Sequence, residues 1–265
     1  MWFLKVALPG LLALALLGAA AGGNVKTIKV GEVTATWLKD NKGENKHPGK
    51  LFSAPDSLLR ALGLEDGIPS TVSAFWVEAN GVKILFDTGL GSGKGLLLDD
   101  LRELGVDPKD VQFVFLTHLH GDHIGGLLDG GRKVFPNAKV YLARAERDGW
   151  QAMKGKNELQ MKTLEAYKDQ LVLFEFGDEL PGKVKALDAV GHTPGHTVFQ
   201  AGKLLVIGDL IHGAALQLVH PEYSPDYDMD KPTAEKSRKR ILEYAKANGL
   251  VMAGMHLPAP AFIGE

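Results

Sequence analysis

The stretch FLTHLHGDHIGG, from Phe115 to Gly126, limits what this chain can fold into more than any other segment. It contains three of the nine histidines and an aspartate, and it continues the apolar run VQFVFLT. A short apolar run next to turn residues predicts a buried strand. The fold must therefore bury this strand while it keeps imidazoles and a carboxylate together at the strand's carboxyl end.

Metal binding explains this composition. His118 and His120 are two residues apart, so on an extended segment their side chains point the same way. Asp122 and His123 follow on a turn that contains Gly121. Neutral imidazoles and carboxylates suit Zn²⁺ and similar divalent ions, and four donors in one loop indicate two ions side by side. The alternative is a surface histidine run without metal, but isolated histidines more often titrate alone, whereas these follow a buried strand.

Three other apolar runs also end in polar side chains. VGHTPGHT places His192 and His196 after the run VKALDAV. LLVIGDL places Asp209 at the end of another apolar strand, and LVMAGMHLP does the same for His256. A carboxylate or imidazole at the end of a buried strand is costly unless it is paired or bound to metal. Each residue alone is equally well explained as a satisfied buried polar group, but four such stretches in one chain favour a metal site.

The remaining sequence alternates between strand and helix patterns. Asn80-Gly81 joins two apolar runs within Thr71–Gly89, which predicts a hairpin. Thr233 is the expected N-cap of a helix that reaches Asn248, with Gly249 in the usual C-terminal position. The pattern predicts an α/β (α+β) protein with two sheets between helices in one domain. Further strands are expected at Lys26–Trp37, 138–143, 170–176, 184–190, 203–210 and 250–256, and further helices at Leu96–Leu104 and Ala145–Tyr167.

The first 21 residues predict a signal peptide. Lys5 precedes an apolar run, and Ala19-Ala20-Ala21 fits the small-residue cleavage rule, so we expect cleavage after Ala21. The run is short for a membrane-spanning helix, and an uncleaved anchor is the alternative. We therefore expect a periplasmic or secreted protein in which residues 22–265 form a single domain, with no stable membrane insertion after cleavage. The chain has no cysteine, so its fold depends on no disulfide.

Several motifs together resemble those of the metallo-β-lactamase superfamily. They are HLHGDH, GHTPGHT, GDL, GMHLP and ILFDTG, and the resemblance runs from about Thr71 to His256. It implies an αβ/βα four-layer sandwich with a binuclear site at one edge. It also implies a role for each polar residue of these motifs. His118, His120 and His192 would hold one ion, Asp122, His123 and His256 the other, Asp209 would bridge both along with a hydroxide, Asp87 would orient a ligand imidazole, and His196 would pack behind His192.

The resemblance implies hydrolytic chemistry. Two divalent ions lower the pKa of a bridging water and polarise the substrate C=O or P=O, while Asp209 and Asp122 act as the catalytic carboxylates. We expect Zn²⁺, with Mn²⁺, Co²⁺ or Fe²⁺ as alternatives. The segments GDLIHGAALQL and GMHLPAPAFIG are similar to the exported branch of methyl parathion hydrolase and related lactonases. That implies cleavage of a lactone, an aryl ester or a phosphotriester.

Other functions stay open. A non-catalytic metal-binding module of the same fold is one alternative, and a thioesterase or β-lactamase is another. The absence of cysteine excludes β-lactamases with a cysteine ligand, and Asp209 disfavours the rest. A formal net charge of −2 argues against a nucleic-acid partner, so we expect a small-molecule substrate. Whether the chain forms a homodimer is left open.

The substrate pocket is less strongly specified. His212 follows Asp209 by three residues and is expected either to face substrate or to be a loop histidine. Leu216, Trp150 and Phe52 are candidates for an apolar wall, although such residues are more often part of the core. The segment Asp40–Ser70 is rich in Gly, Pro and charged residues and predicts a long surface excursion that runs over the site.

Overall fold

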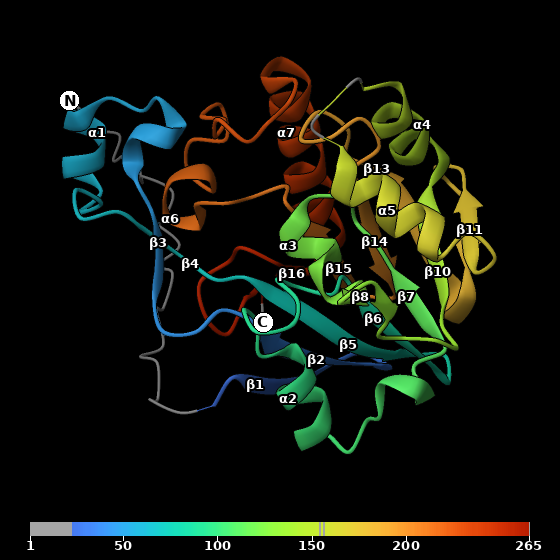
Figure 1. Ribbon diagram of the computed structural model, residues 1–265. Coiled ribbons are helices and arrows are strands. Elements are labelled where there is room, and N and C mark those ends of the chain that lie inside the picture. Colours follow the sequence, from blue (N-terminus) through green and yellow to red (C-terminus); the bar gives the residue numbers. More distant parts are fainter. Residues whose placement is uncertain (1–22, 154, 156, 265) are drawn as a thin grey trace, which may run out of the picture.

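Two sheets form the centre of the molecule in this computed structural model, which describes residues 23–153, 155 and 157–264 (Figure 1). The expected signal peptide lies outside the described residues. The first sheet has the order β1 (Val25–Val30), β2 (Val33–Lys39), β5 (Ser73–Ala79), β6 (Val82–Phe86), β7 (Phe113–Phe115), β10 (Lys139–Ala143) and β11 (Leu171–Phe174). The second has the order β12 (Glu179–Leu180), β13 (Val184–Asp188), β14 (Thr197–Ala201), β15 (Leu204–Gly208), β16 (Val251–Gly254) and β17 (Phe262–Ile263).

Helices connect and cover these sheets. They are α1 (Asp56–Ala61), α2 (Leu97–Glu103), α3 (Gly121–Ile124), α4 (Arg144–Ala152), α5 (Glu158–Ala166), α6 (Ala214–Gln217) and α7 (Lys231–Asn248). Short 3-10 helices lie at η1 (Gly49–Phe52), η2 (Pro108–Asp110), η3 (Gly125–Leu127) and η4 (Pro181–Lys183). Two small strand pairs complete the fold, β3 (Asn45–His47) with β4 (Ile68–Ser70), and β8 (Leu128–Asp129) with β9 (Arg132–Lys133). No helix within the described ranges has the length and apolar character needed to cross a membrane.

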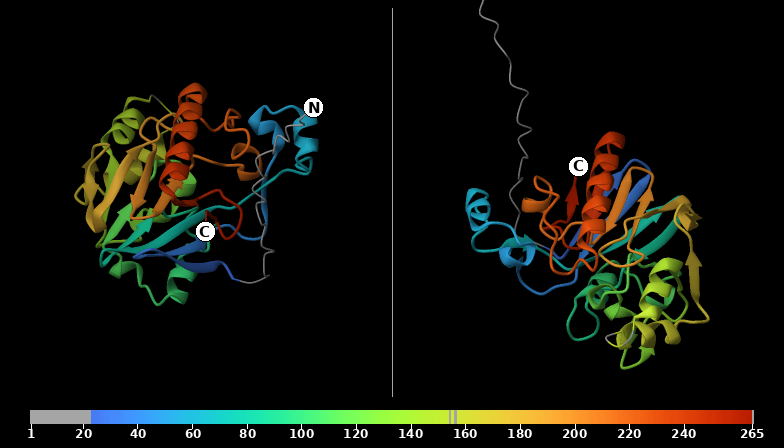
Figure 2. Two further views of the ribbon diagram at one scale, coloured as in Figure 1. Left: turned by 180° about the vertical axis from the view of Figure 1, so that it is seen from behind. Right: turned by 90° about the horizontal axis from the view of Figure 1, so that it is seen from above.

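The core explains the four layers. Phe86 and Phe115 of the first sheet pack with Phe199 of the second, their ring centroids 5.4 to 5.6 Å apart. Ile241 of α7 joins this core from the outer face of the second sheet, while Leu101 of α2 packs on the outer face of the first. Figure 2 shows α7 on one side of the sheets and α2 to α5 on the other. The expected αβ/βα sandwich is therefore confirmed.

Parallel pairing brings the polar strand ends together. β6 and β7 are parallel neighbours in the first sheet, and β15 and β16 are parallel neighbours in the second. The carboxyl ends of parallel strands meet at one edge of a sheet. Asp87 and His118 therefore leave the first sheet at one edge, and Asp209 and His256 leave the second sheet at one edge.

Three expectations about the elements need correction. The single strand expected at Lys26–Trp37 is a hairpin, because the chain turns between Val30 and Val33 and the two strands pair antiparallel. The helix expected over Ala145–Tyr167 is interrupted and forms α4 and α5. β14 was not expected. The hairpin at Asn80-Gly81 is confirmed, with φ values of 49° and 74° that the turn requires.

The N-cap of α7 also differs from the expectation. Asp230 is the cap, and its carboxylate accepts hydrogen bonds from the backbone N–H of Thr233 at 3.1 Å and from the Thr233 hydroxyl at 2.8 Å. Thr233 thus lies inside the first turn. Gly249 ends the helix in the left-handed conformation, as expected.

The segment Asp40–Ser70 has more structure than a surface excursion requires. We call residues 45–70 the arm. It consists of β3, η1, α1 and β4 and has its own small core, in which Phe52, Leu59 and Ile68 pack against Leu216 of α6. In Figure 1 the arm lies beside α6 at the upper left.

Candidate metal centre

Asp87 holds the loop that carries the first four candidate ligands. It follows β6 directly, and its carboxylate is fully buried. It accepts hydrogen bonds from the backbone N–H of Thr117 at 2.8 Å, the Thr117 hydroxyl at 2.7 Å and Nδ1 of His123 at 2.7 Å. This is the contact expected of a carboxylate that orients a ligand imidazole.

The first donor group combines three histidines with Asp209. Nδ1 of His120 lies 3.1 Å from Nε2 of His118 and 2.9 Å from Nε2 of His192. Oδ2 of Asp209 lies 3.1 Å from Nε2 of His192 and 3.6 Å from Nε2 of His118. All four residues can therefore offer one atom each to a single ion.

The second donor group consists of Asp122, His123 and His256. Nε2 of His256 lies 3.4 Å from Oδ2 of Asp122, and Nε2 of His123 lies 3.8 Å from Oδ1 of Asp122. Asp209 also reaches this group. Its Oδ1 lies 3.0 Å from Nε2 of His123, and its Oδ2 lies 3.2 Å from Nε2 of His256. One carboxylate thus lies between the two groups, as the expected bridging position requires.

The outer ring nitrogens of three ligand histidines, His118, His192 and His256, are held by other residues. The Thr117 hydroxyl donates to Asp87, so it accepts from Nδ1 of His118 at 2.9 Å. Such contacts fix the tautomer and leave the inner nitrogen with its lone pair free for a metal. The same arrangement holds for His192, whose Nδ1 donates to Asp228 at 2.9 Å, and for His256, whose Nδ1 donates to the carbonyl of Thr71 at 2.8 Å.

The electrostatics of the site favour a bound cation. Burial lowers the pKa of His118, and it lowers the pKa of His120 to about 3, so both rings are neutral and can act as ligands. Burial also acts to lower the pKa of His256, but Asp209 and Asp122 raise that pKa to about 10. The carboxylates therefore attract positive charge to this position, which a metal ion would supply in place of a proton.

The residues present fit two divalent ions. Nε2 of His123 and Oδ1 of Asp209 are buried and 3.0 Å apart, yet neither has a hydrogen-bond partner of suitable geometry among the described residues. A tetrahedron with corners about 2.1 Å from its centre has edges of about 3.4 Å. The separations of 2.9 to 3.6 Å in the first group are close to that value. The ring nitrogens and carboxylate oxygens at the centre of the site cannot all form hydrogen bonds with one another. A metal ion would bind these otherwise unpaired atoms.

His196 occupies a different position from His192. Its Nδ1 donates to the carbonyl of Ala189 at 3.1 Å, and its Nε2 accepts from the backbone N–H of Asp209 at 2.9 Å. Gly208 permits this approach, because a Cβ there would lie 2.5 Å from Nε2 of His196. Both nitrogens of His196 are thus used by the backbone, and the ring supports the segment that carries Asp209.

Sequence reasoning missed Glu146, a buried carboxylate on α4. It accepts hydrogen bonds from the N–H of Leu119 at 2.9 Å, Nε1 of Trp150 at 2.7 Å, the Thr193 hydroxyl at 2.7 Å and the N–H of Gly195 at 2.7 Å. Burial raises the pKa of Glu146, and these four donors oppose that rise. Glu146 therefore joins the loop of His118–His123 to the loop of His192.

Sequence reasoning also missed Asp228 and His47. Asp228 pairs with His192 on one side and with the buried Arg238 of α7 at 2.8 Å on the other, which ties the ligand to the longest helix. His47 comes from the arm, and its ring lies 5.8 Å from that of His256. Burial lowers the pKa of His47 to about 4, so this ring is neutral. His47 and Asp228 are single polar residues in charged segments, so the sequence contains no pattern that predicts their place at the site.

The four pocket candidates lie in different places. His212 is beside the centre, with Nε2 3.0 Å from Oδ2 of Asp209 and its ring stacked on His256. The ring of Trp150 lies edge-on to that of His120, with the ring centroids 5.7 Å apart. Leu216 and Phe52 are almost fully buried in the core of the arm. These two side chains pack between the arm and α6 and expose almost no surface, so they do not line a pocket directly.

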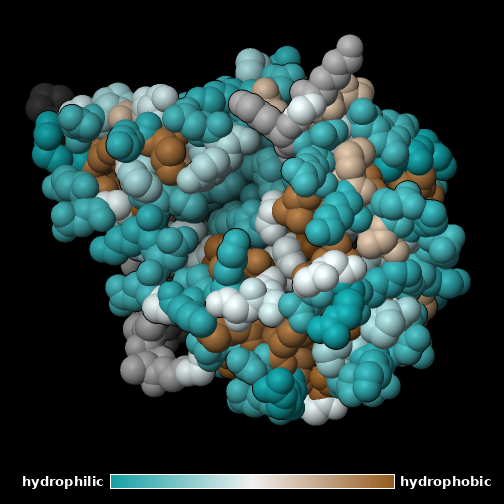
Figure 3. Space-filling view, in the orientation of Figure 1, coloured by the Kyte–Doolittle hydropathy of each residue, from teal (hydrophilic) through white to brown (hydrophobic). Residues whose placement is uncertain are grey.

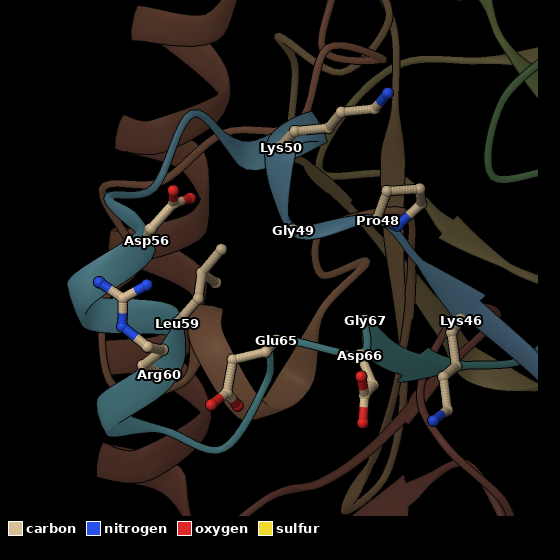
Figure 4. Close-up of a pocket in the computed structure, with 10 residues that line it drawn as sticks. All are labelled: Lys46, Pro48, Gly49, Lys50, Asp56, Leu59, Arg60, Glu65, Asp66 and Gly67. Atoms are coloured by element: carbon tan, nitrogen blue, oxygen red, sulfur yellow. The ribbon is translucent and has the colours of Figure 1, made fainter.

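The molecule is hollowed between the arm and the body. Figure 3 shows a recess with α6 and the arm on one side and α3 and α5 on the other. A separate cavity of about 500 Å³ lies on the arm itself (Figure 4). Charged side chains of both signs surround it, and Lys46 next to His47 is one of them. Because successive strand residues point to opposite faces, this cavity lies on the face of the arm turned away from the metal centre.

Comparison with known families identifies the fold's relatives. The model described as "Metallo-beta-lactamase superfamily" matches residues 67–256. The chain belongs to this superfamily. The expected family is thus confirmed, and the match includes every residue of the two donor groups.

The sequence alignments with curated relatives extend over only part of this metallo-β-lactamase chain. The uncharacterized protein YobT of Bacillus subtilis is 34% identical over 160 residues, which are 56% of this chain and 63% of YobT. The N-acyl homoserine lactonase AttM of Agrobacterium fabrum is 33% identical over 114 residues, which are 38% of this chain and 40% of AttM. The chain therefore spans less than two thirds of the length of these relatives.

Solved structures match almost the whole chain. AidC, a dizinc quorum-quenching lactonase, superposes with a TM-score of 0.79 at 27% identity, over 90% of this chain and 92% of AidC. The hydrolase AbOPH of the beta lactamase superfamily superposes with a TM-score of 0.81 at 29% identity, over 92% of this chain and 93% of AbOPH.

Proposed function

We propose that this chain is a metal-dependent hydrolase that cleaves the ester bond of a lactone. The observation that carries the proposal is the position of Asp209, whose two oxygens lie 3.0 to 3.2 Å from histidines of both donor groups. A carboxylate in this place would hold two ions close to each other and to a water molecule, which is what hydrolysis by a metal-activated water requires.

The two groups would hold one divalent ion each, His118, His120 and His192 the first and Asp122, His123 and His256 the second. Such ions would lower the pKa of a bound water molecule and polarise the substrate carbonyl. Asp209 would orient the attacking water. The water oxygen bonds to the carbonyl carbon, and the ring C–O bond then breaks. Asp122 starts as a carboxylate and is 31% exposed, so it can take up the proton of the attacking water and pass that proton to the leaving oxygen.

The surroundings of the site support a substrate with an apolar tail. Leu159 on α5 and Tyr227 and Met229 after α6 are large apolar side chains that are 42 to 46% exposed. Leu159 lies against Gly121, the ring of Tyr227 lies 5.6 Å from that of His212, and the backbone of Met229 bonds to that of His192. AidC is a lactonase solved with an N-acyl homoserine product, and AttM acts on N-acyl homoserine lactones. We propose the same substrate class here.

A substrate panel tests this function. The full chain is expressed, loaded with Zn²⁺ and assayed on N-hexanoyl homoserine lactone, γ-decalactone, a p-nitrophenyl ester and a phosphotriester. Asp209→Asn, similar in size, serves as the inactive control. We expect the lactones to have the highest kcat/KM. Faster turnover of the phosphotriester or aryl ester would reassign the substrate, and no turnover of any compound would favour a metal-binding module.

Export remains part of the proposal. The motif Ala19-x-Ala21 motivates cleavage before Gly22, which would place the enzyme in the periplasm or outside the cell. N-terminal sequencing of protein from each cell fraction tests this. Mature protein that begins at Gly22 supports it, and Met1 retained in a membrane fraction would favour the anchor.

A further inference from the structure

The last residue of β3 brings the arm to the metal centre. The ring of His47 is surrounded by four other rings, those of Phe52, His212, Tyr227 and His256, at centroid distances of 5.8 to 6.3 Å. His256 is a candidate ligand, and His212 contacts Asp209. His47 is therefore part of the wall of the site, although it is far from the ligands in sequence.

The arm holds this ring firmly. Phe52 and Ile68 of the arm pack against Gly213, where a Cβ would lie 2.9 Å from the Phe52 ring and 3.1 Å from Ile68. This close approach joins the arm to the segment between Asp209 and α6. The side chain of His47 is only 9% exposed, so the ring has little freedom to move away from the site.

One nitrogen of His47 has a structural partner. Nε2 lies 2.9 Å from the Ser70 hydroxyl, and that hydroxyl donates to the carbonyl of Thr71 at 3.2 Å. The hydroxyl has a single proton, so it accepts from His47, and Nε2 carries the proton. The same carbonyl of Thr71 accepts from Nδ1 of His256 at 2.8 Å. A short chain of hydrogen bonds thus links His47 to a candidate ligand.

The other nitrogen is free. Among the described residues, Nδ1 of His47 has no hydrogen-bond partner, and it is not one of the fully buried polar atoms. With the proton on Nε2, Nδ1 is an acceptor. A neutral acceptor fixed in the wall of the site is suited to receive a hydrogen bond from a substrate donor.

We propose that His47 is a specificity-determining residue whose Nδ1 accepts a hydrogen bond from an N–H group close to the scissile carbonyl. This rests on the proposed lactonase function and refines it. The enzyme then prefers lactones that carry an amide N–H beside the ring over lactones with a plain alkyl chain. His47 selects the substrate without taking part in bond cleavage.

Two amide substitutions separate the roles of the two nitrogens. In His47→Gln, the amide lies near the position of Nε2, so the bond to Ser70 is kept and the acceptor at Nδ1 is lost. In His47→Asn, the amide lies near the position of Nδ1, so an oxygen can take over the acceptor role while the bond to Ser70 is lost. His220→Gln is the control, because His220 is a partly exposed histidine bonded to Glu222 outside the metal centre.

The test compares N-hexanoyl homoserine lactone, which has the N–H, with γ-decalactone, which has none. We expect His47→Gln to lower kcat/KM about tenfold for the first, mainly through KM, and less than threefold for the second. His47→Asn should retain most of the preference for the amide substrate. The control should match the wild-type enzyme on both, and metal content should be two ions per chain throughout.

Other results would overturn the proposal. An equal loss on both substrates in His47→Gln would show that the ring only supports the wall. Full activity in His47→Gln with loss in His47→Asn would show that His47 acts through Ser70 on His256. If the wild-type enzyme cleaves neither lactone but cleaves another ester of the panel, the proposed substrate class fails, and the role of His47 fails with it.

Discussion

Replacement of Glu146 by glutamine should loosen the metal centre without removing a ligand. The two carboxylate oxygens accept four hydrogen bonds, two from the side of Leu119 and Trp150 and two from the side of Thr193 and Gly195. A glutamine amide has only one oxygen. It keeps that oxygen toward Leu119 and Trp150, because both of these are fixed N–H donors, and turns its NH₂ toward the other pair.

The cost follows from this orientation. The Thr193 hydroxyl can rotate and accept, but the N–H of Gly195 becomes a buried donor without an acceptor, which costs about 1–3 kcal/mol. Loss of the negative charge weakens the two bonds that remain, because hydrogen bonds to charged groups are the stronger kind. We therefore expect Glu146→Gln to lower the free energy of unfolding by about 2–4 kcal/mol.

Urea unfolding of the zinc-loaded protein measures this change, and competition with a chelator measures metal affinity. Because Glu146 joins the two ligand loops, affinity should fall about 10- to 100-fold, as is usual when a supporting contact is lost. Glu175→Gln is the control, since Glu175 forms an exposed ion pair with Arg144 and should change stability by less than about 1 kcal/mol. A Glu146→Gln protein as stable as Glu175→Gln, with unchanged affinity, would refute the reasoning.

Three further predictions concern other groups. His192→Ala should lose the first ion and nearly all turnover, whereas His196→Ala should keep two ions at reduced activity or stability, and the opposite ranking in metal counts and kcat would make His196 the ligand. Asp209→Ala should lose most activity on any ester, and a two-metal variant with unchanged kcat would disprove its role. Burial and the nearby negative charge of Asp40 raise the pKa of Asp100 to about 7. The Asp100 carboxyl therefore binds its proton more tightly in the folded state than in the unfolded chain, and the free energy of unfolding falls as pH rises from about 4 to 7. Asp100→Asn should show a smaller loss than wild type between pH 5 and pH 8 in urea unfolding, and equal losses would contradict this assignment.

The donor groups were predictable because each donor follows an apolar strand. Burial of such a run carries its polar end to the edge of a sheet, so His118, Asp209 and His256 were found from local sequence. Pairing between strands was harder. The apolar residues change phase at the turn, from Ile28 and Val30 to Val33 and Ala35, but Gly31-Glu32 is not an Asn-Gly signal, so the sequence predicts one strand.

The residues that hold the ligands could not be predicted in the same way. Glu146 lies in RAERDGW, a charged helical segment in which nothing distinguishes it from the acid at position 148. Its burial depends on contacts with Leu119 and Gly195, which are far away in sequence. His47 is one polar residue in a charged segment, and only the packing of the arm against Gly213 brings it to the site. Support of this kind is a property of tertiary packing.

Titration of the metal-free protein tests the binuclear account most directly. The full chain is stripped with a chelator, and Zn²⁺ is added back in steps while bound metal and lactone turnover are measured on the same samples. The account predicts saturation near two ions per chain, with turnover that rises mainly with the second ion, since Asp209 would bridge the two. Full turnover with one ion per chain would contradict it.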